Sequence, residues 1–252
     1  MHFITYTTGG FTHFTENLLK NFEEVLACHS HHIIVVCVDE QARNNLANYA
    51  SKPWLTLEYK KTENSGFASF ANFGTSEYNK ILHYKIVLIR KYLPQYEELY
   101  FVDSDIVFFR DPLPTINATP GDILFQQDAA WNQHHFLYHT YVCAGNIVVR
   151  NNTRTLDFLD KWIKMCNKHP ELNDQEVLYN YFAHINVSDI REVKELHVNV
   201  LPMEEFQNGL DAFQCGWNTK AEKVCIHANY RVGSEAKINA LKSINMWFMN
   251  PE

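Results

Sequence analysis

The sequence lacks any dense stretch of positive charge. Its 22 lysine and arginine residues are outnumbered by 29 aspartate and glutamate residues, which gives a formal net charge of -7 at pH 7. Proteins that follow a phosphodiester backbone do so with clustered basic side chains, so we do not expect nucleic acid as a partner. The acidic excess is compatible with a metal site, although it is also ordinary for a soluble protein.

Two further features are missing, namely a cysteine pair with C-x-x-C spacing and an apolar run of membrane-spanning length. The six cysteines are scattered and lie mostly inside apolar runs, which predicts reduced, buried thiols. The chain opens on a strand-like segment without a basic region before it, so we expect a cytoplasmic protein with no membrane span. The alternative is an excised lumenal domain, in which N-x-S/T triplets at Asn117, Asn151 and Asn186 would be acceptors for glycans.

The 252 residues, 46% of them hydrophobic, are enough for one sizeable core. Short β-rich runs alternate with helical patterns in the first part of the chain, which is typical of an α/β domain with a mostly parallel sheet. We predict strands at 3–7, 32–38, 54–59, 123–126 and 145–149, and a buried strand-like run at 99–109. We predict helices from a cap at Thr12 or Thr15 through Leu26, and at 41–49, 77–93 and 155–166, with a loop at 60–74.

Two carboxylates interrupt the apolar run from Leu99 to Phe109, in the order Asp103-Ser104-Asp105. Burying an unpaired charge is strongly unfavourable, so these carboxylates require a neutralising partner. A hard divalent cation such as Mg²⁺ or Mn²⁺ meets that need, because such ions are typically held by one or two carboxylates together with phosphate oxygens of a substrate. The alternative is a strand end that turns to solvent with a capping aspartate.

Basic residues also occur in unexpected places. Lys85 falls on the apolar stripe of its predicted helix, so its ammonium either extends to solvent or reaches a phosphate as a point charge. His227 ends an apolar run and is followed by Gly233 and Lys237. An imidazole suits Mn²⁺-like ions, a glycine lets the backbone approach a phosphate, and a lysine neutralises it. A histidine at a strand end is also common as an ordinary surface residue.

The order and spacing of these features resemble the GT-A glycosyltransferases. The aspartate pair after a strand, followed by Phe109-Arg110-Asp111-Pro112, looks like the DxD region of that fold. The likeness is strongest to the nucleotide-diphospho-sugar transferases of glycosyltransferase family 77 and more distant to the glycogenin family. It extends over most of the chain, through residues 5–8, the Lys85 helix, 143–146, 173–175, 206–209, the His227 segment and Trp247.

The resemblance implies a single Rossmann-like GT-A catalytic domain over residues 1–252, with a nucleotide-binding half at 1–112 and a donor-sugar and acceptor half at 113–252. Asp103, Asp105 and His227 match the metal ligands, with Asp105 and His227 the firmest; the alternative for Asp103 is a contact to the ribose or the donor sugar. The rest of the implied cofactor-binding set is Tyr6, Thr7 and Thr8 at the nucleoside, Lys85, Gly233 and Lys237 at the diphosphate, and in addition Ser104 and Gly145. The implied catalytic set is Asp128, Asp174 and Gln175 around the transferred sugar, with Lys85 stabilising the leaving group.

The chain departs from the glycogenin group where Cys143-Ala144-Gly145 replaces Asn-Ser-Gly, which removes an amide that would bind a sugar hydroxyl. The implied reaction moves a sugar from a nucleotide-diphosphate donor to an acceptor hydroxyl with retention of anomeric configuration, using Mn²⁺ or Mg²⁺. UDP is the expected nucleotide because the resembled families use it. Asp174 or Asp128 is expected to steady the oxocarbenium-like centre and Gln175 to orient it.

Two other functions are consistent with parts of the sequence. An apolar strand ending in Asp-x-Asp also describes the nucleophile of haloacid-dehalogenase phosphohydrolases, in which Asp103 would be phosphorylated. A non-catalytic carbohydrate-binding module is suggested by the 14% aromatic content, which includes Trp131, Trp217 and Trp247.

Overall fold

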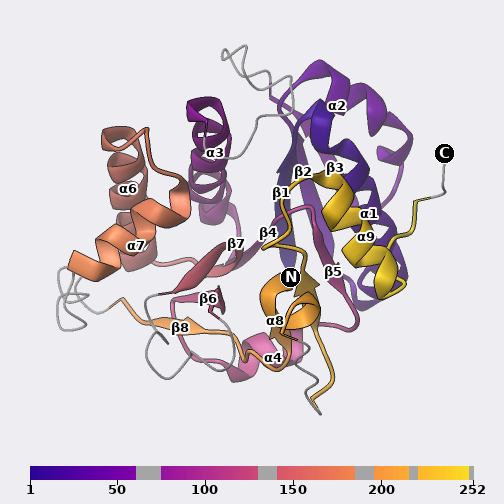
Figure 1. The fold of residues 1–252 in the computed structure, drawn as a ribbon. Helices are drawn as coiled ribbons and strands as arrows, with labels where there is room; N and C mark the ends of the chain where they lie inside the picture. The colour runs from indigo at the N-terminus through magenta and orange to yellow at the C-terminus, as the bar shows by residue number, and fades with distance from the viewer. Residues whose placement is uncertain (61–74, 130–140, 185–195, 216–220, 250–252) are drawn as a thin grey trace.

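The computed structural model describes residues 1–60, 75–129, 141–184, 196–215 and 221–249. Its centre is a seven-stranded sheet flanked by helices, with strand order β3-β2-β1-β4-β7-β6-β8 (Figure 1). Strands β3, β2, β1 and β4 are parallel, β7 runs antiparallel to both of its neighbours, and β6 and β8 are parallel. This confirms the predicted α/β class with a mostly parallel sheet. The strands are β1 (His2–Thr7), β2 (His32–Cys37), β3 (Leu55–Tyr59), β4 (Glu98–Val102), β6 (Ile123–Gln127), β7 (Val142–Arg150) and β8 (Val198–Val200).

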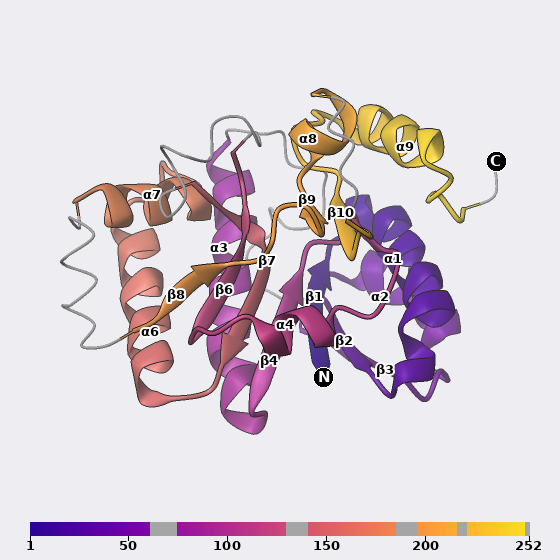
Figure 2. The same ribbon diagram turned by 90° about the horizontal axis from the view of Figure 1, so that it is seen from below.

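A second, three-stranded sheet lies beside the first and has the order β5-β10-β9 (Figure 2). Its strands are β5 (Ile106–Phe108), β9 (Phe206–Gln207) and β10 (Cys225–His227). The apolar run that the sequence presents as one strand at 99–109 is therefore divided. Its first part, β4, belongs to the large sheet and its second part, β5, to the small one, with the turn Asp103-Ser104-Asp105 between them.

Helices cover both faces of the large sheet. Alternate residues of a strand point to opposite faces, so Phe3 and Tyr100 join the core under α1, whereas Ile4 and Phe101 join the core under α3 and α6. Figure 1 shows α3, α6 and α7 on one side of the sheet and α1 and α2 on the other. The helices are α1 (Thr12–Val25), α2 (Glu40–Asn45), α3 (Ser76–Tyr92), α4 (Leu113–Ala118), α6 (Thr153–Lys168), α7 (Asp174–His184), α8 (Gly209–Phe213) and α9 (Ser234–Ser243), with 3₁₀ turns at Gly9–Phe11, Ala27–His29, Ala47–Tyr49 and Leu93–Gln95.

Capping side chains fix the starts of the two longest helices, α3 and α6. Thr75 accepts a hydrogen bond from the amide of Tyr78 at the start of α3, and Asn152 accepts one from the amide of Thr155 at the start of α6. The predicted cap of the first helix is wrong. Thr12 lies inside α1, where its hydroxyl donates to the carbonyl of Gly9 (3.0 Å), and the N-cap residue has no capping side chain.

Asp122 ties the second half of the large sheet together at the start of β6. Its carboxylate accepts hydrogen bonds from Arg154 (2.8 Å) and Asn152 (2.8 Å) at the start of α6 and from the amide of His197 (2.9 Å) just before β8. Burial alone would raise the pKa of Asp122, but these donors outweigh it and hold the pKa below its ordinary value.

The remaining sequence predictions are met in part. All six cysteines are free, and four of them are buried. The strand predicted at 145–149 is longer, since β7 covers Val142–Arg150, and the loop predicted at 60–74 lies almost wholly outside the described residues. Among the helices that the structure describes, none is both long and apolar enough to cross a membrane.

Candidate functional site

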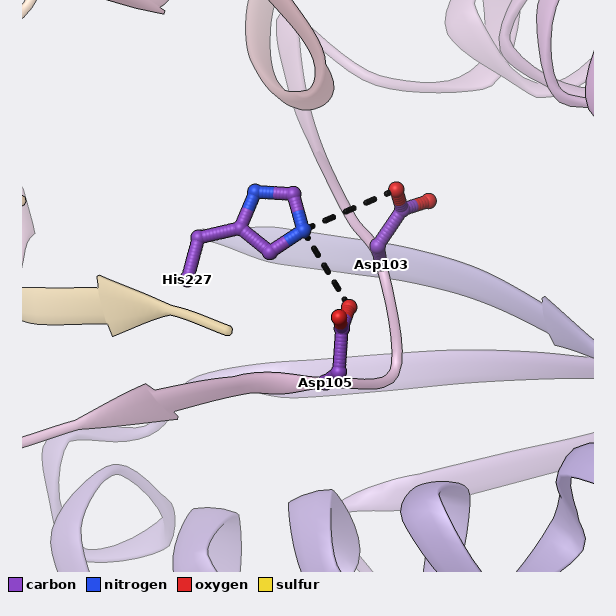
Figure 3. A group of neighbouring side chains, drawn as sticks. All are labelled: Asp103, Asp105 and His227. Atoms are coloured by element: carbon purple, nitrogen blue, oxygen red, sulfur yellow. Dashed lines mark ion pairs between the residues drawn. The ribbon is translucent and has the colours of Figure 1, made fainter. Parts of the chain in front are cut away.

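The turn between β4 and β5 and the end of β10 bring two aspartates and a histidine together. Strand β10 pairs antiparallel with β5 so that His227 lies opposite Ile106, and the amide of Ala228 donates to the carbonyl of Asp105 (3.1 Å). As Figure 3 shows, His227 Nε2 then faces both carboxylates, 3.2 Å from Asp105 Oδ1 and 3.9 Å from Asp103 Oδ2. The pairing of two short strands thus explains how residues far apart in sequence meet.

The chemistry of this group fits a divalent cation. One ligand atom from each of Asp103, Asp105 and His227 lies within 4.8 Å of the others. Carboxylate oxygens with one imidazole nitrogen suit Mn²⁺ or Mg²⁺ better than the soft ions that prefer sulfur. Burial alone would raise the pKa of Asp105, but the Lys237 ammonium and the His227 ring hold it well below its usual range. The two neighbouring groups thus favour the ionised form of this carboxylate, which is the form that binds a metal ion.

Gly145 on β7 forms the wall behind this group. Its carbonyl accepts a hydrogen bond from the amide of Asp103 (2.7 Å). A Cβ atom at this position would lie 2.2 Å from Asp103 Oδ2 and 2.6 Å from His227 Cε1, both far inside van der Waals contact. The site therefore requires glycine here because the backbone of β7 approaches the two side chains so closely.

Lys85 reaches the site from α3 and is almost fully buried, at 2% exposure. Its ammonium lies 3.0 Å from Asp174 Oδ2, 3.5 Å from Asp103 Oδ1 and 3.2 Å from the carbonyl of Ala144. Burial would lower its pKa, but the two carboxylates more than reverse this effect and raise it well above the ordinary value. The alternative in which Lys85 extends to solvent is wrong, because its ammonium lies between two acidic side chains.

A second polar cluster lies around Asp128, which follows β6. Its carboxylate accepts hydrogen bonds from Gln175 Nε2 (2.6 Å), the Tyr179 hydroxyl (3.0 Å) and Asn229 Nδ2 (2.9 Å). The other end of the Gln175 amide accepts a hydrogen bond from the amide of Ala144 (3.0 Å). Burial raises the pKa of Asp128 despite these donors. The side chains of Asp128 and Gln175 are thus held in one fixed arrangement.

The residues at the end of β1 and at the start of α9 line the same cleft as the aspartate turn. Tyr6, Thr7 and Thr8 are buried, and the Tyr6 hydroxyl donates to the carbonyl of Ile81 (2.8 Å), which braces β1 against α3. Gly233 has a φ of +87° at the N-cap of α9, and Lys237, one turn into that helix, forms an ion pair with Asp105 Oδ2.

Most of these groups line one cleft of about 610 Å³, a size within the usual range for small-molecule sites. Every site residue predicted from the sequence lies in its wall, namely Tyr6, Thr7, Thr8, Lys85, Asp103, Ser104, Asp105, Asp128, Gly145, Asp174, Gln175, His227, Gly233 and Lys237. The cleft opens at the carboxyl ends of β1 and β4, where open α/β sheets bind their ligands.

Sequence reasoning did not assign several residues that line the same cleft, including Phe11, Tyr78, Asn229 and Tyr230. Asn229 and Tyr230 follow His227 so closely that the strand end itself was a signal for them. Phe11 and Tyr78 carried no comparable signal, because an aromatic residue beside a helix start is common in any core. Trp131 and Trp217 lie outside the described residues, and Trp247 packs edge-on against Phe14, with ring centroids 5.6 Å apart, in a core cluster.

The family follows from a comparison with known proteins. Residues 28–241 match the family model described as nucleotide-diphospho-sugar transferase. The chain belongs to this family. The match covers most of the chain and includes Lys85, both aspartates of the turn and His227, so the family predicted from the sequence is confirmed.

The individual relatives of this chain among known proteins have low sequence identity to it. The UDP-galactose:fucoside alpha-3-galactosyltransferase of Dictyostelium discoideum is 22% identical over an alignment of 287 residues, gaps included. This alignment covers 96% of this chain and 42% of the relative. An uncharacterized protein of Arabidopsis thaliana is 25% identical and is matched over 84% of this chain and 52% of its own length. The chain thus spans about half the length of the curated relatives it matches.

The fold of this transferase is similar to that of the galactosyltransferase LgtC, whose structure was solved in complex with donor and acceptor sugar analogues. The two superpose with a TM-score of 0.65 at 13% identity, over 100% of this chain and 98% of LgtC. This likeness confirms the GT-A fold that the sequence predicted.

Proposed function

We propose that the chain is a metal-dependent glycosyltransferase that moves a sugar from a UDP-sugar to an acceptor hydroxyl with retention of anomeric configuration. The observation that carries this proposal is the convergence of two carboxylates, one imidazole and one lysine in a single cleft of a nucleotide-diphospho-sugar transferase. The UDP donor is supported by the name of the Dictyostelium relative, which specifies UDP-galactose.

The two halves of the chain contribute to one catalytic domain in this proposal. Residues 1–112 supply β3, β2, β1 and β4, and residues 113–252 supply β7, β6 and β8 of the same sheet. The cleft has walls from both halves. We therefore assign the nucleoside to the end of β1 beside Phe11 and Tyr78, and the donor sugar to the side of Asp128 and Gln175.

Asp105 and His227 are the proposed principal metal ligands, and Asp103 completes the set. Bound Mn²⁺ or Mg²⁺ would act as a Lewis acid that neutralises charge on the departing diphosphate. The protein holds its ligands ready for this role, since the strand pairing of β5 with β10 fixes the distance between Asp105 and His227 and the β7 backbone holds Asp103.

Lys237 and Gly233 are the proposed contacts to the diphosphate. Lys237 pairs with Asp105, so its ammonium already lies beside a carboxylate that we propose as a metal ligand. Binding of a divalent ion to Asp105 would release the lysine for contact with a phosphate oxygen. The first turn of α9, which follows the N-cap residue Gly233, adds backbone amides that favour a bound anion.

The donor-sugar end of the cleft is assigned to Lys85, Asp174, Asp128 and Gln175. Lys85 neutralises both Asp103 and Asp174. We assign it this ion-pair role first and a contact to phosphate second. Asp128 orients Gln175 by accepting from its amide nitrogen, while the Gln175 carbonyl oxygen is held by Ala144. Preorganised polar groups of this kind stabilise developing positive charge on a sugar without reorganising during the reaction.

The experiment that tests this function is a panel of sugar nucleotides with Mn²⁺, scored by release of nucleoside diphosphate. We expect one donor to be hydrolysed slowly without acceptor and the activity to be lost in Asp105→Ala. The matched control is Asp111→Ala, which removes an aspartate that pairs with His31 (2.8 Å) and does not line the cleft. If no donor is bound or hydrolysed, the proposal is wrong; if Mn²⁺ supports hydrolysis of a generic aryl phosphate instead, the phosphohydrolase alternative replaces it.

A further inference from the structure

The imidazole of His227 has partners on both edges of its ring. Nε2 faces Asp105 and Asp103, as described above, and Nδ1 lies 3.2 Å from Gln126 Oε1 and 3.4 Å from Cys143 Sγ. The ring itself is buried, at 3% exposure. Its orientation is therefore set by protein groups rather than by solvent.

A histidine that binds a metal through Nε2 must carry its proton on Nδ1, and that proton needs an acceptor. The carbonyl oxygen of a glutamine is a good acceptor, whereas the sulfur of a cysteine is a weak one. Cys143 Sγ also lies 3.3 Å from the amide nitrogen of Gly145, which donates to it. Gln126 is therefore the stronger partner for Nδ1–H.

The direction of the Gln126 amide is determined by its other end. Gln126 Nε2 lies 3.3 Å from the carbonyl oxygen of Phe206 on β9, and a carbonyl oxygen can only accept. The amide nitrogen must therefore face Phe206 and the amide oxygen must face His227. The side chain is completely buried, so a reversed amide would set its oxygen against the carbonyl oxygen of Phe206 and leave that oxygen without a donor.

An irregularity in the sheet places Gln126 at this point. Strand β6 pairs with β7 in regular register from Ile123 to Phe125, but Gln126 is then opposite Cys143 instead of Asn146. The skipped residues of β7 include Gly145, whose carbonyl holds Asp103. One break in register thus positions both Asp103 and Gln126, the partner of His227 Nδ1.

We propose that Gln126 is the positioning residue of His227, accepting a hydrogen bond from Nδ1–H so that Nε2 is presented unprotonated to the cation between Asp103 and Asp105. This inference rests on the proposed metal site. It assigns a role in metal binding to a side chain that lies in the core and does not line the cleft.

The test compares five proteins: wild type, Gln126→Met, Gln126→Glu, Gln127→Met and His227→Ala. Methionine keeps the length of the side chain but removes the acceptor, whereas a protonated glutamate keeps both a carbonyl oxygen facing His227 and an O–H group facing Phe206. Gln127 is the matched control because it is the next residue of β6, is equally buried, and bonds to the carbonyl of Tyr141 (2.9 Å) instead of to His227.

Two measurements are made on each protein, the affinity for Mn²⁺ in the presence of UDP by isothermal titration calorimetry and the ¹⁴N modulation of the Mn²⁺ spin echo, which reports a bound imidazole nitrogen. We expect Gln126→Met to bind Mn²⁺ about 10- to 100-fold more weakly, the usual effect of losing the outer partner of a metal-bound histidine. Its ¹⁴N signal should fall, while Gln126→Glu and Gln127→Met keep both the affinity and the signal.

The outcomes separate this inference from the proposed function. If wild type binds Mn²⁺ and Gln126→Met binds it equally well with an unchanged ¹⁴N signal, the positioning role is refuted and the metal site stands. If Gln126→Glu and Gln127→Met lose as much affinity as Gln126→Met, Gln126 acts only through core packing and the inference is also wrong. If wild type and His227→Ala bind Mn²⁺ alike, the metal site itself fails.

Discussion

The replacement Gly145→Ala tests the geometry of the proposed metal site with a single methyl group. The added Cβ would lie 2.2 Å from Asp103 Oδ2 and 2.6 Å from His227 Cε1, and an ordinary contact begins at 3.4 Å. Restoring that contact requires the carboxylate to retreat by about 1.2 Å and the ring by about 0.8 Å. Metal sites tolerate ligand displacements of only about 0.2 Å, so neither side chain would remain in place for the ion.

The expected loss of Mn²⁺ affinity is about 100-fold, or ~2.8 kcal/mol. Losing only the hydrogen-bond partner of a metal ligand already weakens metal binding by up to about 100-fold, and here two ligands themselves are displaced. The expected loss of folding stability is smaller. Overpacking a core typically costs about 1–3 kcal/mol, and the Asp103 side chain, which is 28% exposed, can turn toward solvent. Affinity is measured from the electron paramagnetic resonance signal of free Mn²⁺, and stability from urea unfolding.

The control for this prediction is Gly121→Ala, at the start of β6. Gly121 has a φ of +148°, its added Cβ would lie 2.8 Å from Leu124 Cδ2, and it does not line the cleft. This variant should lose stability and keep its Mn²⁺ affinity. A folded Gly145→Ala protein that binds Mn²⁺ as wild type does would refute the assigned ligand geometry.

Further predictions follow from the ion pairs of the structure. Lys237→Met removes a competitor for Asp105 and a charge for the diphosphate, so calorimetry should show tighter binding of Mn²⁺ alone and weaker binding of UDP with Mn²⁺; a change of both affinities in the same direction would contradict the account. Lys85→Met leaves two carboxylates without their buried counter-ion and should lower the free energy of unfolding by about 3–5 kcal/mol, an expectation that a near-neutral result in urea would overturn. The pKa of Asp122 is held below its ordinary value by donors such as Arg154, so its contribution to stability is present above about pH 4 and is lost as pH falls through the lowered pKa. Asp122→Asn should therefore lose about 1–3 kcal/mol at neutral pH and show a weaker dependence of stability on pH in acid, whereas parallel pH profiles for variant and wild type would count against this assignment.

The parts of the fold that could be predicted from the sequence are those with strong local patterns. The β-branched run of β2 and the apolar stripe of α3 each determine their own structure, and their predicted bounds differ from the observed ones by a residue or two. The division of the run at 99–109 between two sheets was not predictable, because it depends on β10, which pairs with β5 from more than a hundred residues away. Local pattern carries no information about such a partner.

The candidate site shows the same limit. Two aspartates in an apolar run and a lysine on an apolar stripe are detectable because buried charge requires an explanation. Gln126 carried no such signal, since a glutamine near the end of a strand is unremarkable until the register break beside Cys143 and the ring of His227 are known. The alternatives left open for Lys85 were likewise decided only by the positions of Asp103 and Asp174.

The central claim is that Asp103, Asp105 and His227 hold a cation that in turn holds a diphosphate. The most direct measurement is the calorimetric affinity for UDP and for uridine, each with Mn²⁺ and with EDTA, in wild type and in Asp105→Ala. We predict that Mn²⁺ strengthens the binding of UDP to wild type, does not change the binding of uridine, and has no effect on UDP binding to Asp105→Ala. Equal affinity for UDP in Mn²⁺ and in EDTA, or an enhancement by Mn²⁺ that persists in Asp105→Ala, would contradict the account.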